Sequence, residues 1–210
     1  SIWLFLFNES GYYLGHVRAN EVTYQKTDAN TDKGEGTFST PSIPSTVRRI
    51  HFIANYNAAD VDDSELLNRT EKEVMTRFTS SSGRLVYWGR KVFNSEDELT
   101  SYFTDNSTSP IILYRNQAAV TYQKAENVTD EFEIQGFAIC NTYAKGTVVP
   151  YNHQNETNPF DFDLTTESQG RAVHDYVTLC SGEDLIKATD PEDTEVQNKW
   201  GLRYIFEHEN

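Results

Sequence analysis

The fold is decided by two stretches, RIHFIANY at residues 49–56 and PIILYRNQAAVTY at residues 110–122. Both are rich in β-branched and aromatic residues, which is typical of β-strands. Neither contains a catalytic signature, and the second leads into another strand-like run at residues 132–141. These segments indicate sheet building rather than chemistry, so the sequence predicts a scaffold or an adhesion module.

The composition favours a thin, aromatic core. The chain has 210 residues, which is enough for one large all-β domain or for one and a half smaller ones. Hydrophobic residues make up 37% of the chain, on the low side for a globular protein, and aromatic residues make up 13%. Because each aromatic side chain buries a large area, we expect a core of the kind found in β-sandwiches.

The charge and the hydropathy pattern exclude several classes of partner. A formal net charge of −14 repels nucleic acid, which we therefore exclude as a partner, and it disfavours anionic lipid. No apolar run is long enough to span a membrane, so we expect a mature chain that is not membrane-spanning. The chain starts inside an apolar run, and we expect that sequence has been removed before Ser1 and after Asn210.

Strand signals recur along the chain, and residues 2–7 and 12–17 predict a hairpin with a turn at 8–11. We expect residues 111–123 and 131–141 to pair as long antiparallel strands. The remaining predicted strands or extended segments are residues 22–26, 38–43, 47–54, 84–88, 173–180 and 202–206. The composition shifts near Gly146, which predicts a division into residues 1–148 and residues 149–210.

Two segments carry helical signals. Residues 64–78 place apolar side chains near helical spacing, and the capping-box pattern from Thr70 to Glu73 predicts that this helix begins or restarts there. A second capping-box pattern, from Ser95 to Glu98, predicts a short helix over residues 95–104.

The polar residues predict no catalytic, cofactor or metal site. The five histidines lack metal-ligand spacing, and His51 is predicted to be a structural histidine inside a strand. The carboxylates at residues 60–63 favour a helix start over a calcium site. The pair Asp161 and Asp163 has no neighbours that support glycosidase chemistry.

Two further groups of residues have a structural and a functional interpretation. Cys140 and Cys180 are predicted to be buried free thiols, with a disulfide in an exported protein as the alternative. Core packing is favoured over a sugar-stacking platform for four aromatic residues, namely Tyr87, Trp88, Tyr151 and Trp200.

These segments together resemble a known family, the Bacteroidales fimbrillins, which are subunits of type V pili. The matching elements are WLFLFNESG at 3–11, IHFIAN at 50–55, RLVYWG at 84–89, LYRNQAAV at 113–120 and FAICN at 137–141 leading to Gly146. Their order resembles the N-terminal domain of the family over residues 1–148, and residues 149–210 resemble the start of its C-terminal domain.

The resemblance implies a mainly β fold: a transthyretin-like antiparallel β-sandwich with one or two short helices, followed by part of a second β domain. It implies a cell-surface fimbrial subunit, shaft or tip, that is exported through the outer membrane as a lipoprotein precursor and is not an enzyme. The implied partners are other pilus subunits, joined by donor-strand insertion, and a host glycan or protein. The lipid-bearing Cys and the cleavage site of the family are not seen here, so residues of the strand-exchange groove stay unassigned. The alternative is a free-standing carbohydrate-binding surface module.

Overall fold

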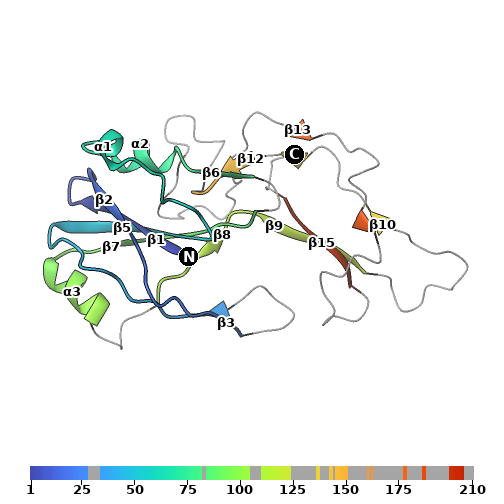
Figure 1. Ribbon diagram of the computed structural model, residues 1–210, viewed down its shortest axis with the longest axis horizontal. Helices are drawn as coiled ribbons and strands as arrows, with labels where there is room; N and C mark the ends of the chain where they lie inside the picture. Colours follow the sequence, from blue (N-terminus) through green and yellow to red (C-terminus); the bar gives the residue numbers. More distant parts are fainter. Residues whose placement is uncertain are drawn as a thin grey trace, which may run out of the picture.

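A computed structural model describes residues 1–27, 34–81, 84–104, 110–123, 136–137, 142–143, 145–150, 160, 162, 177–178, 186–187 and 199–205. Its main element is a five-stranded antiparallel sheet, in the order β2-β1-β5-β7-β8 (Figure 1). The strands are β1 (Ile2–Asn8), β2 (Tyr13–Arg18), β5 (Val47–Ala54), β7 (Tyr87–Val92) and β8 (Tyr114–Arg115). The predicted hairpin at 2–17 and the predicted strand at 47–54 are therefore confirmed.

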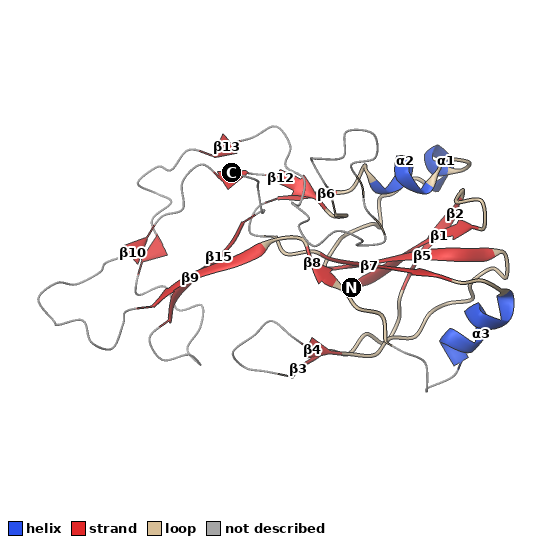
Figure 2. Cartoon of the chain, turned by 180° about the vertical axis from the view of Figure 1, so that it is seen from behind, coloured by secondary structure: helices blue, strands red, loops and turns tan. Residues whose placement is uncertain are grey.

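Shorter strand pairs lie outside this sheet, and all of them are antiparallel. They are β3 (Gln25–Lys26) with β4 (Gly34–Glu35), β6 (Thr79–Ser81) with β12 (Lys145–Thr147), β9 (Ala118–Gln123) with β15 (Lys199–Ile205), β10 (Gly136–Phe137) with β14 (Ile186–Lys187), and β11 (Thr142–Tyr143) with β13 (Val177–Thr178). The β9–β15 pair extends away from the five-stranded sheet (Figures 1 and 2).

The five-stranded sheet is buried on both faces, which explains the uninterrupted apolar run of β1. Successive side chains of a strand point to opposite faces. Phe5 of β1 accordingly packs in one cluster with Met75 and Phe78, while Leu4 packs in a second cluster with Leu99. The helices α1 (Asp63–Leu66) and α2 (Glu71–Met75) lie over the first face, and α3 (Glu96–Thr104) lies over the second (Figure 2).

The prediction of a single helix at 64–78 is wrong, because the chain forms two separate helices there, α1 and α2. Asn68, between them, has a φ of 62°, which a helix cannot accommodate. The predicted restart at Thr70 is confirmed: its hydroxyl accepts a hydrogen bond from the Glu73 N–H, and the Glu73 carboxylate accepts one from the Thr70 N–H at 2.8 Å. The predicted helix at 95–104 is also confirmed.

The predicted pairing of residues 111–123 with 131–141 is wrong where the structure describes these residues. Asn116 and Gln117 divide the first run, so that β8 pairs with β7 while β9 pairs with β15. Both side chains are buried and hydrogen-bonded to other parts of the chain, and Asn116 accepts from the Val86 N–H at 3.0 Å. Of the second run, β10 pairs with β14.

The molecule is mainly β, as predicted, with three short helices among the residues described. Two predicted strands are displaced or shortened: the segment at 84–88 becomes a strand only at Tyr87–Val92, and that at 22–26 only at Gln25–Lys26. In the described part of the chain, no helix is long and apolar enough to cross a membrane.

Candidate functional site

The two outermost strands of the five-stranded sheet pair with their neighbours over different lengths. β2 pairs with β1 through five residue pairs, whereas β8 pairs with β7 through only two. At one edge, β8 has only two residues and pairs with Tyr87 and Trp88 alone. The rest of β7, Gly89–Val92, has no strand beside it on this side within the described ranges. Unpaired strand edges are where another chain can add a strand, so this half of β7 is the candidate assembly site.

The direction of the backbone groups in β7 shows what this edge offers. The Phe93 N–H donates to the Arg48 carbonyl at 2.7 Å, toward β5, while the Val86 carbonyl accepts from the Asn116 N–H at 2.9 Å on the opposite side. Because backbone groups alternate in direction along a strand, the N–H and C=O of Val92 face outward. Val92 therefore presents one donor and one acceptor to an incoming strand.

Apolar side chains are exposed on and beside this edge. Val92 is 43% exposed, and Ile112 and Tyr114 are 62% and 40% exposed. Ile112 is held outward because the segment 111–113 lies directly against β7: a Cβ on Gly89 would lie 2.4 Å from the Ile112 carbonyl oxygen. Ile111 and Leu113 pack into the second core cluster at the same time. An incoming strand would meet apolar surface as well as open hydrogen-bonding groups.

A buried charge cluster lies under β5 and β7 and holds α2 onto the sheet. At its centre is Glu71, which is 5% exposed. Its carboxylate accepts hydrogen bonds from Arg90 Nε at 2.6 Å, from Arg49 Nη1 at 2.9 Å and from His51 Nε2 at 2.6 Å. Because β5, β7 and α2 each supply a charged or titratable member, this cluster ties the three elements together.

The protonation states in this cluster follow from its donors. The Trp88 indole N–H can only donate, so His51 Nδ1, 2.9 Å away, accepts, and His51 Nε2 carries the proton that Glu71 receives. His51 is thus neutral, in agreement with burial, which lowers its pKa. Burial raises the pKa of the Glu71 carboxyl, but the hydrogen bonds from His51 and Arg90 and the Arg90 charge outweigh it and hold that pKa well below its usual range. The cluster is an internal network in which one carboxylate accepts from two guanidinium groups and a neutral imidazole.

His16 forms a second polar cluster that was not foreseen. Its Nδ1 lies 2.6 Å from Asp63 Oδ1, and its Nε2 lies 3.0 Å from the Ala58 carbonyl oxygen. The Tyr13 hydroxyl donates to the same Asp63 oxygen at 2.5 Å, and burial and this carboxylate raise the pKa of Tyr13. The three side chains attach the first residue of α1 to β2.

The structure confirms several of the predicted roles. His51 is a satisfied structural histidine, Trp88 is a core residue, and Asp62 caps α1 by accepting from the Ser64 N–H at 2.9 Å.

Within the described residues, no group of three or more His, Cys, Asp or Glu is placed to hold a metal ion. Other predicted positions lie outside the described residues or have undescribed side chains, namely Cys140, His153, Tyr151, Asp161, Asp163, His174, Cys180, Trp200 and His208.

Glu71 was missed because the sequence showed it only as the first residue of a capped helix. A signal was nevertheless present in β5, where Arg49 and His51 are two residues apart and so share one face. A charged residue and a histidine on the buried face of a strand require a carboxylate partner. The sequence gives no indication of which of the 32 acidic residues supplies it.

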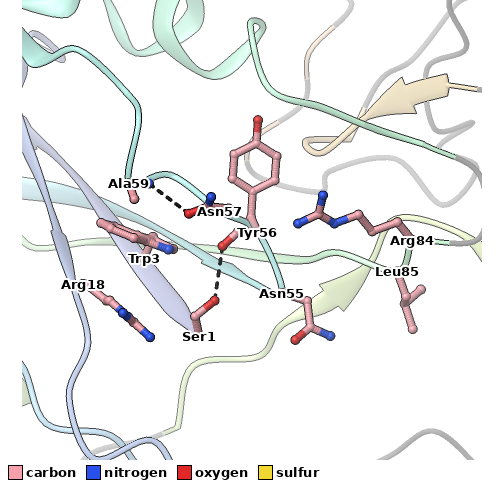
Figure 3. Close-up of a pocket in the computed structure, with 9 residues that line it drawn as sticks. All are labelled: Ser1, Trp3, Arg18, Asn55, Tyr56, Asn57, Ala59, Arg84 and Leu85. Atoms are coloured by element: carbon pink, nitrogen blue, oxygen red, sulfur yellow. Dashed lines mark hydrogen bonds between the residues drawn. The ribbon is translucent and has the colours of Figure 1, made fainter.

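A depression of about 620 Å³ opens at the end of the sheet where β1 begins (Figure 3). Trp3 comes from β1 and Arg18 from β2, and two segments outside the strands, 55–59 and 84–85, complete the wall. The lining residues are Ser1, Trp3, Arg18, Asn55, Tyr56, Asn57, Ala59, Arg84 and Leu85. Sequence reasoning did not identify this pocket, because its residues come from four separate segments.

Comparison with known proteins places the chain near a fimbrial subunit. It is 28% identical, over 170 residues or 80% of its length, to the major fimbrium tip subunit FimE of Porphyromonas gingivalis, both in strain ATCC 33277 and in a second sequence from the species. The chain spans 27% of the length of these curated relatives. No family model and no solved structure matches it. The predicted resemblance to the Bacteroidales fimbrillins is thus confirmed, and this chain is a distant homologue of a major fimbrium tip subunit.

Proposed function

We propose that this chain is a structural subunit of a cell-surface fimbrium. The observation that carries the proposal is the similarity to a fimbrium tip subunit over 80% of the chain. A role in assembly and display requires no catalytic group, and the two polar clusters described above bond inward to hold elements together. The chain would be exported through the outer membrane as a lipoprotein precursor, and its partners would be other fimbrial subunits.

We further propose that the subunit joins its neighbours by accepting a β-strand at the open half of β7. An added strand gains affinity from main-chain hydrogen bonds and register from alternate side-chain contacts. The outward N–H and C=O of Val92 supply the hydrogen bonds, while Ile112 and Tyr114 supply apolar contacts. In this proposal the incoming strand extends the five-stranded sheet, residues 1–148 form the N-terminal, transthyretin-like sandwich domain, and residues 149–210 begin the second domain.

The test uses the full-length protein in cells that assemble it. Val92→Pro removes the outward N–H, a change that edge positions tolerate and that leaves the β5–β7 ladder intact. Val92→Ala, the matched control, keeps the N–H and removes only the apolar side chain. We expect Val92→Pro to reduce the subunit recovered in sheared fimbriae by about tenfold or more, the effect of a loss of about 1.4 kcal/mol, and Val92→Ala to reduce it less. Incorporation of a folded Val92→Pro subunit at the wild-type level would refute assembly through this edge.

A free-standing carbohydrate-binding module with an aromatic row on one sheet face is less well supported. Trp88, one of the residues that such a row needs, is 1% exposed and donates its indole N–H to His51. Adhesion to a host glycan or protein is instead proposed here as an additional role of the fimbrial subunit.

A further inference from the structure

We propose that the pocket lined by Trp3, Arg18, Asn55, Tyr56 and Arg84 binds a sugar that carries a carboxylate. This inference rests on the proposed adhesive role and deepens it by naming the class of ligand. The pocket shares no lining residue with the open half of β7, so ligand binding and assembly can be tested separately.

The first observation is the charge of the pocket. Its lining includes two arginines and no carboxylate, in a chain whose net charge is −14. Arg18 and Arg84 lie on opposite sides of the depression (Figure 3). Neither guanidinium has an ion-pair partner among the residues that the structure describes. Two unpaired guanidinium groups facing one depression favour an anionic ligand, which they can bind through charge-assisted hydrogen bonds.

The second observation is a buried donor without an acceptor. Trp3 is only 9% exposed, and its ring packs against His16 with the ring centroids 5.3 Å apart. Its indole nitrogen faces the depression (Figure 3), and in the described part of the chain it has no hydrogen-bond partner. Buried polar groups in proteins are nearly always satisfied, and an indole N–H can only donate. An acceptor from a ligand, such as a carboxylate oxygen, would satisfy it.

The third observation concerns the loop that forms the back of the pocket. Asn55 has a φ of 60°, a conformation that non-glycine residues seldom adopt and that recurs at binding sites. The Asn57 side-chain oxygen already accepts from the Ala59 N–H at 3.2 Å, so its amide NH₂ remains available as a donor. Tyr56 is held by an edge-on contact with Phe78, at 5.6 Å between centroids.

These groups together match a carboxylated pyranose better than a simple anion. The guanidinium groups and the indole N–H suit a carboxylate, while the two asparagine amides suit ring hydroxyls, which both donate and accept. The depression, at about 620 Å³, has room for one or two sugar units. Sialic acids and hexuronic acids both carry this chemistry, and the experiment distinguishes them.

The experiment is a titration of the isotope-labelled full-length chain followed through its indole N–H signals. The chain has three tryptophans, so Trp3 can be assigned from the signal lost in Trp3→Phe. The probes are sialyllactose, glucuronic acid, neutral lactose and an acetylated glutamate peptide. We expect the Trp3 signal to shift with one or both acidic sugars, more weakly with the peptide and not with lactose, while the buried Trp88 signal stays in place.

Variants then test the arginines. Arg18→Gln and Arg84→Gln should each weaken binding by about tenfold, because each removes a hydrogen bond to a charged group. The control is Arg77→Gln, since Arg77 is exposed, lies outside the pocket and has no ion-pair partner in the described ranges. A Trp3 signal that does not respond to either acidic sugar would overturn the proposal. So would an equal response to lactose, or a stronger response to the peptide. Normal incorporation of Arg84→Gln into fimbriae would show that assembly does not depend on the pocket. A failure of the sugar-binding proposal would then leave the assembly proposal standing.

Discussion

Buried charge is tolerated at Glu71 because every neighbour of its carboxylate is a hydrogen-bond donor. His51 is a donor only in its neutral form with the proton on Nε2, since Nδ1 accepts from Trp88. A second proton on His51 would therefore remove the Trp88 hydrogen bond. The cluster is compatible with one protonation state, an ionised Glu71 beside a neutral His51, and it should respond to acid.

The free energy of unfolding should fall on acidification, in two stages. The folded-state pKa of His51 is lowered, so the unfolded chain binds the extra proton first, and stability declines once the pH falls below about 6.5. The folded-state pKa of Glu71 is also lowered, so its contribution is present above about pH 4.3 and is lost as the pH falls further. Urea unfolding followed by tryptophan fluorescence between about pH 2 and about pH 8 measures both stages.

His51→Gln separates the histidine from the other titrating groups. The glutamine amide can accept from Trp88 and donate to Glu71, but it does not titrate. We expect the variant to lose the part of the slope between about pH 6.5 and pH 5, where one group contributes at most about 1.4 kcal/mol per pH unit. Superimposable profiles for the two proteins would show that His51 does not sense acid.

At the scale of elements, the sequence predicted strands and helices where the signal is local. The run at 47–54 and the capping box at Thr70 are local patterns, and both were predicted correctly. The division of residues 111–123 into two strands was not predicted. It depends on hydrogen bonds between Asn116 and two partners, Val86 and Ser80, which lie 30 or more residues away in the sequence. The candidate assembly site and the pocket could not be predicted from the sequence for the same reason, because an edge or a pocket is defined by which strands become neighbours.

The capping box should make a measurable contribution to the stability of α2. Thr70→Ala removes the hydroxyl that accepts from the Glu73 N–H, and we expect it to lower the free energy of unfolding by about 1 kcal/mol. Thr70→Ser, which keeps the hydroxyl, should lower it by less. Chemical denaturation of the two variants side by side makes the comparison, and equal losses would mean that the hydroxyl contributes nothing.

The contact between β7 and the segment 111–113 depends on a position without a side chain. Gly89→Ala would place a Cβ 2.4 Å from the Ile112 carbonyl oxygen, which belongs to the backbone and cannot swing away. We expect a destabilisation of about 1–3 kcal/mol, measured by thermal or chemical unfolding. Val92→Ala, at an exposed position in the same strand, is the control, and a Gly89→Ala protein as stable as this control would contradict the close approach.

At the scale of the whole molecule, the sheet has covered faces and unequal edges. The apolar run at 2–7 predicted a buried strand, but the residues that cover it come from α2 on one side and α3 on the other. Sequence patterning shows that a strand is buried and does not show what buries it. This is why the mainly β class was predictable, while the layered arrangement around the five-stranded sheet was not.

Amide hydrogen exchange should map these edges directly. The Phe93 and Ala19 N–H groups donate to the carbonyls of Arg48 and Ile2, at 2.7 and 2.9 Å, and we expect both to exchange slowly. The outward-facing N–H of Val92 should exchange faster by orders of magnitude. Protection of Val92 equal to that of Phe93 in the isolated chain would show that something already covers this edge.

The position of β1 also determines how the sheet would respond to mechanical tension. β1 is paired along its length with β2 on one side and β5 on the other, in registers of five and seven residue pairs. Tension directed along β1 loads both ladders in shear, so their hydrogen bonds share the force and have to break together rather than one after another. The same strand, pulled sideways, would peel open bond by bond. The direction of the applied force, more than its magnitude, would then determine how long the sheet resists unfolding.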